Sequence, residues 1–241
     1  NEVHAKSGGT FDVTLGPLIE LWGFGPRKPE DPVPADDAIT AALAGVGQSQ
    51  LLDLDKAAGT LAKSAPEVGI NLSAIAKGYG VDAVAQTLQG FGVENYMVEI
   101  GGDLVTLGKN LAGEPWRIGI EKPDPSAQAV QLVVPVSDLG LATSGDYRNY
   151  FEHEGQRYSH ILDPVTGRPV THATTSVTVI AETAMMADAW ATAMLVLGRE
   201  AGLKVAESQN LAVFFIDRDV QAGEDAYITA TSAAFDALNA K

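Results

Sequence analysis

Asp188 and Thr192 are the two residues whose types and spacing first indicate chemistry. Between Glu182 and Arg199 the sequence is almost entirely apolar, and Asp188 is its single charge. Residues four apart share one face of a helix, and a helix that is apolar on all sides is normally buried. A buried carboxylate is costly unless it is paired, so Asp188 requires a metal cation, an Arg or Lys, or a water-filled cleft. From this stretch alone, a structural ion pair or hydrogen bond is slightly favoured over a ligand site.

His160 and Lys77 are the next candidates. Of the four histidines, only His160 lies between strand-like residues beside a tight polar turn, at 163–167. Histidine titrates near neutral pH and is the commonest general base, but a hydrogen bond that ties the turn explains His160 equally well. Lys77 lies among small residues near the start of a predicted helix, where a positive charge is mildly unfavourable. That position favours a ligand contact, although a solvated surface lysine is the commoner case.

Two polar segments have both a functional and a structural interpretation. Thr10, Asp12 and Thr14 precede a predicted helix and are suited either to gripping a ligand or to capping the helix. Residues 144–146, Ser-Gly-Asp, are predicted to form a turn that lines a substrate site, with Arg148 pairing the acid of the turn. The alternative for the second segment is an ordinary turn with a surface ion pair.

The hydrophobic pattern predicts the helices that must hold these residues. β-Branched residues over 176–181 indicate a strand, followed by the apolar helix through to Gly198. A second helix is capped by Asn71 or Ser73 and ends at Gly90. Its buried side is predicted to comprise Ile75, Tyr79, Val84 and Leu88. Shorter helices are predicted after Pro17 and over 35–44.

The remaining segments are predicted to be strands. Residues 50–63 form a hairpin, and residues 95–163 form a meandering, mostly antiparallel sheet with turns at Gly101-Gly102 and Glu154-Gly155. Residues 211–219 form a buried strand, and residues 227–235 form the final edge strand.

Composition narrows the class of partner. The chain has 241 residues with a net charge of -15 at pH 7 and no cysteine. Such a charge argues against nucleic acid or an anionic membrane as partner. Any bound phosphate must therefore be held by a metal, backbone amides or a local lysine. No stretch is long and apolar enough to span a membrane, and neither a P-loop nor a GxGxxG fingerprint occurs.

Six motifs follow one another in the order and spacing of a known family. They are GTFDVTLGPLIELWGFGP, AIAKGYGVDAV, EIGGDL, LATSGDYRNYF, YSHILDPVTGRPV and SVTVIAETAMMADAWATAMLVLG. The chain thereby resembles the ApbE family of FAD:protein FMN transferases. The resemblance implies an α+β fold of mixed, mostly antiparallel sheets flanked by helices, with a T-fold-like architecture. It implies a single domain over residues 1–241, in which two α/β lobes with the active site between them are one arrangement.

The resemblance also implies a reaction and its residues. A family member splits FAD at its pyrophosphate, attaches FMN to a Thr or Ser hydroxyl of an acceptor flavoprotein and releases AMP, with Mg²⁺ as cofactor. The metal ligands would be Asp188, Thr192 and the main-chain oxygen of Ala74, and His160 would be the base. The flavin nucleotide would contact Thr10, Phe11, Asp12, Asn71, Lys77 and Leu162.

Two substitutions and one missing segment distinguish this chain from many members. Asn71 stands where many have Asp, and Ala184 where many have Cys; neither is expected to abolish metal binding. The chain is expected to be N-terminally truncated relative to full-length members, and hence to bind flavin incompletely. The acceptor implied is a subunit of a membrane redox complex, and the location periplasmic or extracytoplasmic, with a lipid anchor allowed in the full-length form. An FAD pyrophosphatase that yields FMN and AMP, and a non-catalytic FAD-binding protein, stay open as alternatives.

Overall fold

The computed structural model describes residues 1–24, 33–124, 129–219, 221–222 and 226–240. The chain divides into two compact units. Unit 1 comprises Asn1–Leu72 and Asn149–Thr171, and unit 2 comprises Ser73–Arg148 and His172–Lys241. In the described part of the chain, no helix has both the length and the apolar character needed to cross a membrane.

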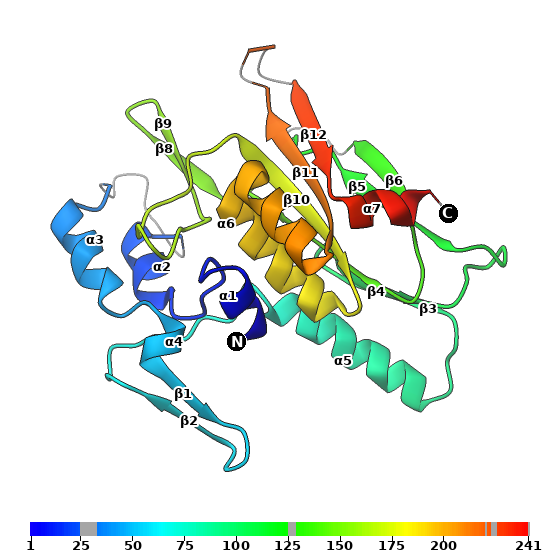
Figure 1. Cartoon of the computed structure of the whole chain (residues 1–241), viewed down its shortest axis with the longest axis horizontal. Coiled ribbons are helices and arrows are strands. Elements are labelled where there is room, and N and C mark those ends of the chain that lie inside the picture. Colours follow the sequence, from blue (N-terminus) through cyan, green and yellow to red (C-terminus); the bar gives the residue numbers. More distant parts are fainter. Residues whose placement is uncertain (25–32, 125–128, 220, 223–225, 241) are drawn as a thin grey trace. The chain divides into compact units, whose positions relative to one another are not determined.

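Unit 2 is built on a six-stranded sheet with the order β12-β11-β10-β7-β4-β3 (Figure 1). Every neighbouring pair in it is antiparallel, as the sequence predicted. The strands are β3 (Tyr96–Ile100), β4 (Asp103–Leu107), β7 (Gly140–Gly145), β10 (Thr174–Ala181), β11 (Ala212–Arg218) and β12 (Tyr227–Thr231). Both glycines of the β3–β4 turn, Gly101 and Gly102, have positive φ angles, which confirms the predicted hairpin.

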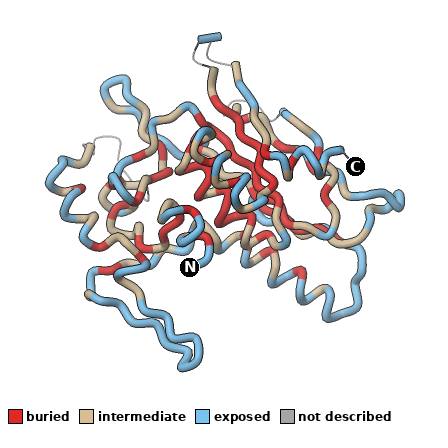
Figure 2. The backbone as a smooth tube through the Cα atoms, in the orientation of Figure 1, coloured by how far each residue is buried: buried red, intermediate tan, exposed pale blue. Residues whose placement is uncertain are grey.

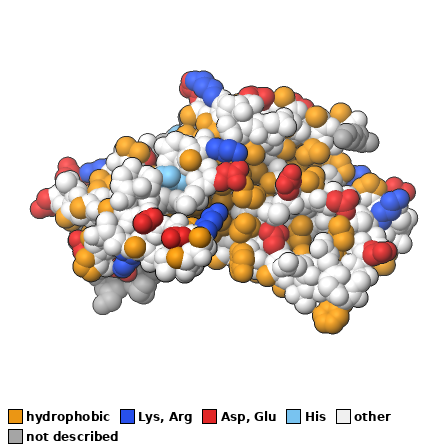
Figure 3. Space-filling model, turned by 60° about the horizontal axis from the view of Figure 1, so that its bottom comes forward, with side chains coloured by type: hydrophobic (Ala, Val, Ile, Leu, Met, Phe, Trp, Pro, Cys, Tyr) orange, Lys and Arg blue, Asp and Glu red, His pale blue; other side chains and the backbone are white. Residues whose placement is uncertain are grey.

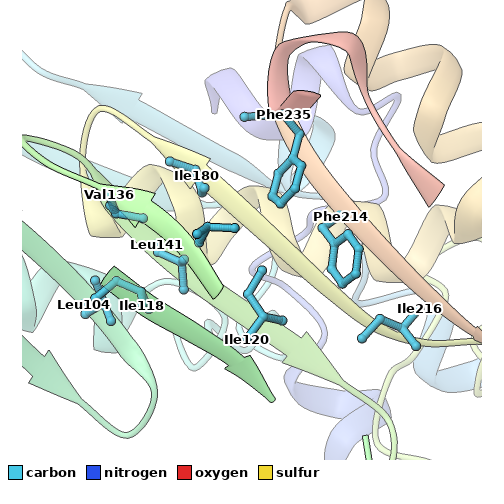
Figure 4. Close-up of a cluster of buried hydrophobic side chains, with 11 residues drawn as sticks. Leu104, Ile118, Ile120, Val136, Leu141, Ile180, Phe214, Ile216 and Phe235 are labelled. Atoms are coloured by element: carbon cyan, nitrogen blue, oxygen red, sulfur yellow. The ribbon is translucent and has the colours of Figure 1, made fainter. Parts of the chain in front are cut away.

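Each face of this sheet is covered by other elements of unit 2. Helices α5 (Ala76–Gly90) and α6 (Ala184–Gln209) lie side by side on one face, where α6 crosses β7 and β10 and α5 crosses β3 and β4. On the other face, an apolar cluster joins the sheet to the β5–β6 hairpin (Trp116–Glu121 and Val130–Val136) and to α7 (Ala233–Asn239). Figure 4 shows Phe235 of α7 beside Phe214 of β11, with their rings stacked at 5.5 Å between centroids.

Burial follows from this layering. Side chains of a strand point alternately to the two faces of a sheet, so a strand covered on both faces is buried throughout. All but the last residue of β10 are buried, and six of the seven residues of β11 are buried as well, as the tube in Figure 2 shows. The predicted strand at 176–181 and the buried strand at 211–219 are therefore confirmed.

Unit 1 consists of short helices and two hairpins. Its elements are α1 (Glu2–Lys6), α2 (Gly16–Trp22), α3 (Asp36–Leu43), α4 (Gln48–Leu51), β1 (Leu52–Asp55), β2 (Thr60–Lys63), β8 (Tyr150–His153) and β9 (Gln156–Ser159). Leu18, Trp22, Ile39 and Leu162 form its buried centre. The Trp22 indole donates a hydrogen bond of 2.7 Å to the Gly167 carbonyl, and this bond ties α2 to the polar turn at 163–167.

Several predictions about the elements were wrong in part. Residues 95–163 do not form one sheet, because β5–β6 and β8–β9 are separate two-stranded sheets. The predicted edge strand ends at Thr231, and α7 begins two residues later. The helix that begins at Ala184 ends at Gly198 as predicted, where φ is 71°, but a second helical segment of α6, which was not predicted, follows directly and runs to Gln209.

The buried side of α5 was predicted correctly only in part, since Leu88 packs against a buried cluster. Tyr79 is 64% exposed and Val84 44% exposed, whereas Gly78, Val81 and Ala85 are buried. The helix begins after Ile75, with no side-chain cap, so neither Asn71 nor Ser73 caps it. The close approach of α5 to α6 is made at a residue without a side chain, Gly78.

The surface reflects the net charge of the chain. Figure 3 shows acidic side chains distributed over one face, with fewer Lys and Arg side chains between them. This distribution matches the net charge of -15 and gives the protein a field that repels anions.

Replacing Gly78 by Ala tests the contact between α5 and α6. A Cβ at this position would lie 2.3 Å from the Ala184 carbonyl oxygen, so the two helices must separate to admit it. We expect Gly78→Ala to lower the free energy of unfolding by about 1–3 kcal/mol or more, measured by urea denaturation.

Gly80→Ala is the matched control in the same helix, because the nearest atom to its added Cβ would be the Ile100 Cδ1 atom at 3.6 Å. It should be neutral or gain about 0.5–1 kcal/mol from the better helix propensity of Ala. Equal losses in the two variants would contradict the proposed role of the close approach at Gly78.

Candidate functional site

Asp188 lies in the first half of α6 and is buried, as predicted, with 4% of its surface exposed. Its Oδ2 atom accepts a hydrogen bond of 3.0 Å from the Gly78 amide of α5. Burial is the main cause that raises the pKa of Asp188, while the Gly78 hydrogen bond and the Lys77 charge oppose the rise. Asp188 is thus held in place by a backbone amide of a neighbouring helix.

The start of α6 is fixed by α5 and by its own cap. The Thr183 side chain accepts a hydrogen bond from the Met186 amide, as an N-cap residue does. The Asp82 carboxylate of α5 accepts hydrogen bonds of 2.9 Å from the amides of Ala184 and Met185. An acid at this end also complements the helix dipole. The sequence analysis missed Asp82, whose position four residues after Gly78 on the same helix face was the available signal.

Asp103, the first residue of β4, is the most important residue that the sequence analysis missed. It is 1% exposed, and the Lys77 Nζ atom lies 3.0 Å from its Oδ2 atom. Burial and the neighbouring Asp188 carboxylate raise the pKa of Asp103 to about 6, and Lys77 opposes the rise. The EIGGDL motif contains Asp103, but an acid after a Gly-Gly turn looks like an ordinary turn residue.

Thr192 and Ala74 are the other two predicted metal ligands. Thr192 lies one helical turn after Asp188, and its hydroxyl is 3.2 Å from the Ser144 hydroxyl. In a regular helix the Gly78 amide would donate to the Ala74 carbonyl, but here it donates to Asp188. No described residue donates a hydrogen bond to the Ala74 carbonyl, so this oxygen is available to a ligand.

The oxygen atoms in this region are suitable ligands for a hard cation. Mg²⁺ prefers carboxylate, hydroxyl and carbonyl oxygens and commonly retains waters or substrate phosphates. Within the described ranges no cluster of three or more His, Cys, Asp or Glu side chains is placed to hold a metal. A cation here would therefore depend on Asp188, the Thr192 hydroxyl and the Ala74 carbonyl, the set that the sequence analysis predicted. No measurement tests that assignment, and it stays a prediction.

The predicted flavin contacts near the N-terminus lie in unit 1. Phe11 is 3% and Asp12 8% exposed. The Asp12 carboxylate accepts hydrogen bonds from the amide and hydroxyl of Thr14 and from the Gln48 amide. The Thr10 hydroxyl donates to the Ser7 carbonyl. The Asp12 side chain therefore ties its own loop to the start of α4, and a flavin contact of these residues stays a prediction.

Asn71 and Leu162 also lie in unit 1. The Asn71 amide donates a hydrogen bond of 2.8 Å to the Val13 carbonyl. Leu162 is 3% exposed, belongs to the buried centre of this unit and forms a β-bridge with Pro169. Of the predicted nucleotide contacts, Lys77 alone belongs to unit 2.

The geometry of His160 fits a proton acceptor. Its Nδ1 atom lies 3.0 Å from the Asn149 carbonyl. A carbonyl only accepts hydrogen bonds, so Nδ1 carries a proton, and Nε2 is the basic nitrogen whenever the ring is neutral. The Phe24 ring meets the imidazole edge-on at 6.4 Å between centroids. The backbone thereby fixes the tautomer that a general base requires.

The predicted pair of Asp146 with Arg148 was wrong. Asp146 accepts hydrogen bonds from Arg218 and from the Thr175 hydroxyl, while Arg148 pairs with Glu121. Ser144 and Gly145 end strand β7 rather than forming a turn. Asp146 is therefore a buried structural acid. Ser144 is connected to the candidate site only by the contact of its hydroxyl with that of Thr192.

A comparison with protein-family models identifies the chain's relatives. The model described as the ApbE family matches residues 1–215. The chain belongs to the ApbE family. The resemblance found in the six motifs is therefore confirmed, and so is the expected α+β fold.

Characterised members of the ApbE family are similar over most of the chain. The FAD:protein FMN transferase of Haemophilus influenzae is 45% identical over 232 residues, which cover 95% of this chain and 66% of that protein. The enzyme of the same name from Vibrio cholerae is 50% identical over 208 residues, covering 86% and 61%. The chain thus spans less than two thirds of the length of these relatives.

The crystal structure of the Pseudomonas stutzeri flavinyl transferase ApbE superposes with a TM-score of 0.85. Its sequence is 43% identical, and the match covers 100% of this chain and 72% of that structure.

The pair of buried carboxylates predicts a pH dependence of stability in metal-free buffer. The pKa of Asp103 rises from 3.8 to about 6 on folding, so the folded state binds the proton more tightly than the unfolded state. Its contribution to stability is fully present below pH 3.8 and is lost as the pH rises through about 6. We expect the free energy of unfolding of the wild type, relative to Asp103→Asn, to fall between pH 4.5 and 7.5. Urea denaturation in EDTA measures this difference, and a difference that rises with pH would contradict the prediction.

Proposed function

We propose that this protein transfers FMN from FAD to a Thr or Ser hydroxyl of an acceptor flavoprotein, with Mg²⁺ as cofactor and AMP as the leaving group. The observation that carries the proposal is the buried Asp188 of α6, which accepts a hydrogen bond from the Gly78 amide next to Lys77 and precedes Thr192 by one helical turn, in an acidic member of the ApbE family. The curated relatives named FAD:protein FMN transferase support the same reaction.

Charge neutralisation explains why the reaction needs this cluster. Phosphoryl transfer depends mainly on positioning and on electrostatic stabilisation. A bound Mg²⁺ would neutralise negative charge on the pyrophosphate. Asp188, the Thr192 hydroxyl and the Ala74 carbonyl are the groups that would hold it, while Lys77 adds a positive charge near the substrate. In a protein of net charge -15, such local positive charges are required to bind an anionic nucleotide.

His160 provides the proton acceptor. In the neutral tautomer fixed by Asn149, its Nε2 lone pair accepts the proton of the acceptor hydroxyl. The hydroxyl oxygen forms a bond to the phosphorus of the FMN moiety, and the bond from that phosphorus to the bridging oxygen breaks with departure of AMP.

Partner and location form part of the proposal. We propose that the acceptor is a subunit of a membrane redox complex, and that the protein acts in the periplasm or another extracytoplasmic compartment. Both statements rest on the family to which the chain belongs. The net charge of -15 also makes nucleic acid an unsuitable partner.

Removing the charge of Asp188 should abolish transfer. Asp188→Asn retains an oxygen that accepts the Gly78 hydrogen bond, but it lacks the charge needed for a divalent cation. We expect no FMN on the acceptor after incubation with FAD and Mg²⁺, measured by intact-protein mass spectrometry, whereas the wild type modifies it. Wild-type levels of modification by the variant would refute the metal assignment.

The same incubation separates the alternatives. Rapid release of FMN and AMP in the absence of acceptor, without modification when acceptor is added, identifies an FAD pyrophosphatase. FAD that remains bound and intact with Mg²⁺ present identifies a binding protein without turnover.

Replacing His160 tests the base. His160→Ala should retain FAD binding and slow transfer by about 10²–10⁴-fold, the usual contribution of a general base. His153→Ala is the matched control, because His153 also lies in unit 1 on the β8–β9 hairpin and has no assigned role. Quenched time courses analysed by mass spectrometry measure both rates. An unchanged transfer rate in His160→Ala would exclude His160 as the base.

A further inference from the structure

Asp103 differs from the other buried carboxylates of the chain in its lack of donors. Asp12 accepts three hydrogen bonds from Thr14 and Gln48. Asp217 accepts one from the Thr174 hydroxyl and pairs with Arg199. Such partners are what buried charges normally have.

Asp103 has the Lys77 ammonium at 3.0 Å from Oδ2 and no hydrogen-bond donor to Oδ1 among the described residues. It is nevertheless 1% exposed. One oxygen of a fully buried carboxylate is thus left without a donor from the protein.

The neighbour of Asp103 increases the imbalance. Asp188 is close enough for its charge to raise the pKa of Asp103, and it is also buried, with a single amide on its Oδ2 atom. When both carboxylates are ionised, Lys77 neutralises one of them, and the cluster retains one negative charge. Two like charges at close range repel strongly where water is excluded. A cation bound between the two carboxylates would offset this repulsion.

We propose that Asp103 is a further carboxylate ligand of the divalent cation held by Asp188. This inference rests on the proposed function, because it concerns the same cation. The ammonium of Lys77 pairs with Oδ2 of Asp103 and leaves Oδ1 to the cation. Lys77 thereby holds the carboxylate in position. Two carboxylates with a hydroxyl and a main-chain carbonyl form an oxygen set that suits Mg²⁺ or Mn²⁺.

The test is metal binding in the absence of flavin, with Mn²⁺ as the probe. Free Mn²⁺ is measured by electron paramagnetic resonance during titration of the wild type, Asp103→Asn, Asp188→Asn and Asp217→Asn. We expect Asp103→Asn to weaken Mn²⁺ binding by roughly 10–100-fold or more and Asp188→Asn to abolish it. Asp217→Asn should bind like the wild type, because it removes a buried, paired carboxylate outside the cluster.

The possible results separate this inference from the proposed function. Wild-type affinity in Asp103→Asn with loss in Asp188→Asn would overturn the role of Asp103 and leave the proposed function standing. A wild type that binds no Mn²⁺ would overturn both. Weakened binding in both variants supports both.

Thermal unfolding supplies a second test, because replacing this buried acid is expected to raise the Tm rather than lower it. In EDTA at pH 7.5, Asp103→Asn should raise the Tm, because it removes one of two repelling charges, whereas Asp217→Asn should lower it. Mg²⁺ should raise the Tm of the wild type and leave that of Asp103→Asn almost unchanged. If Asp103→Asn does not fold, Asp103→Ser is the substitute, since it also removes the carboxylate charge. A lower Tm in EDTA together with a wild-type response to Mg²⁺ would overturn the inference.

Discussion

The backbone contact at the first residue of α6 is the constraint on which the position of Asp188 depends. Gly78 of α5 and Gly140 of β7 approach Ala184 so closely that a Cβ on either would lie 2.3 Å from its backbone. Asp82 binds the amides of Ala184 and Met185. A helix and a sheet strand thus fix the start of α6 together. Because packed interiors do not deform continuously, the orientation of α6 and of the carboxylate that it carries is set by these contacts.

Electrostatics imposes the second constraint. The protein has a net charge of -15, yet a nucleotide pyrophosphate is itself an anion. Lys77 is already paired with Asp103, so it cannot alone balance two carboxylates and a phosphate. The proposed divalent cation would resolve both difficulties, since it would neutralise the two carboxylates and attract the nucleotide. The close-packed helix start therefore holds charges in a place where, without a cation, they would be destabilising.

Buried residues could be predicted from the sequence where large side chains make the contact, and not where the contact depends on glycine. Helical spacing in an apolar stretch correctly predicted a buried Asp188 on α6. The same reasoning failed for α5, where Tyr79 is exposed and Gly78 is buried. A hydrophobic pattern detects large apolar side chains, but the α5–α6 contact requires the absence of a side chain. Gly198 was interpreted correctly, because its positive φ interrupts α6 and separates two helical segments.

Asp12 and Asp103 show why the candidate site could be predicted only in part. Both acids follow a glycine pair in a polar turn, and nothing local distinguishes them. The fold gives Asp12 two amides and a hydroxyl, so its charge is satisfied within its own loop. It gives Asp103 one ammonium and a second carboxylate from a distant part of the chain. The unmet bonding capacity of a buried acid is a property of the neighbours that the fold supplies, and for Asp103 those neighbours lie on α5 and α6. Sequence patterns identify polar residues that share one element, as Asp188 and Thr192 do, and overlook a residue that joins them only through tertiary packing.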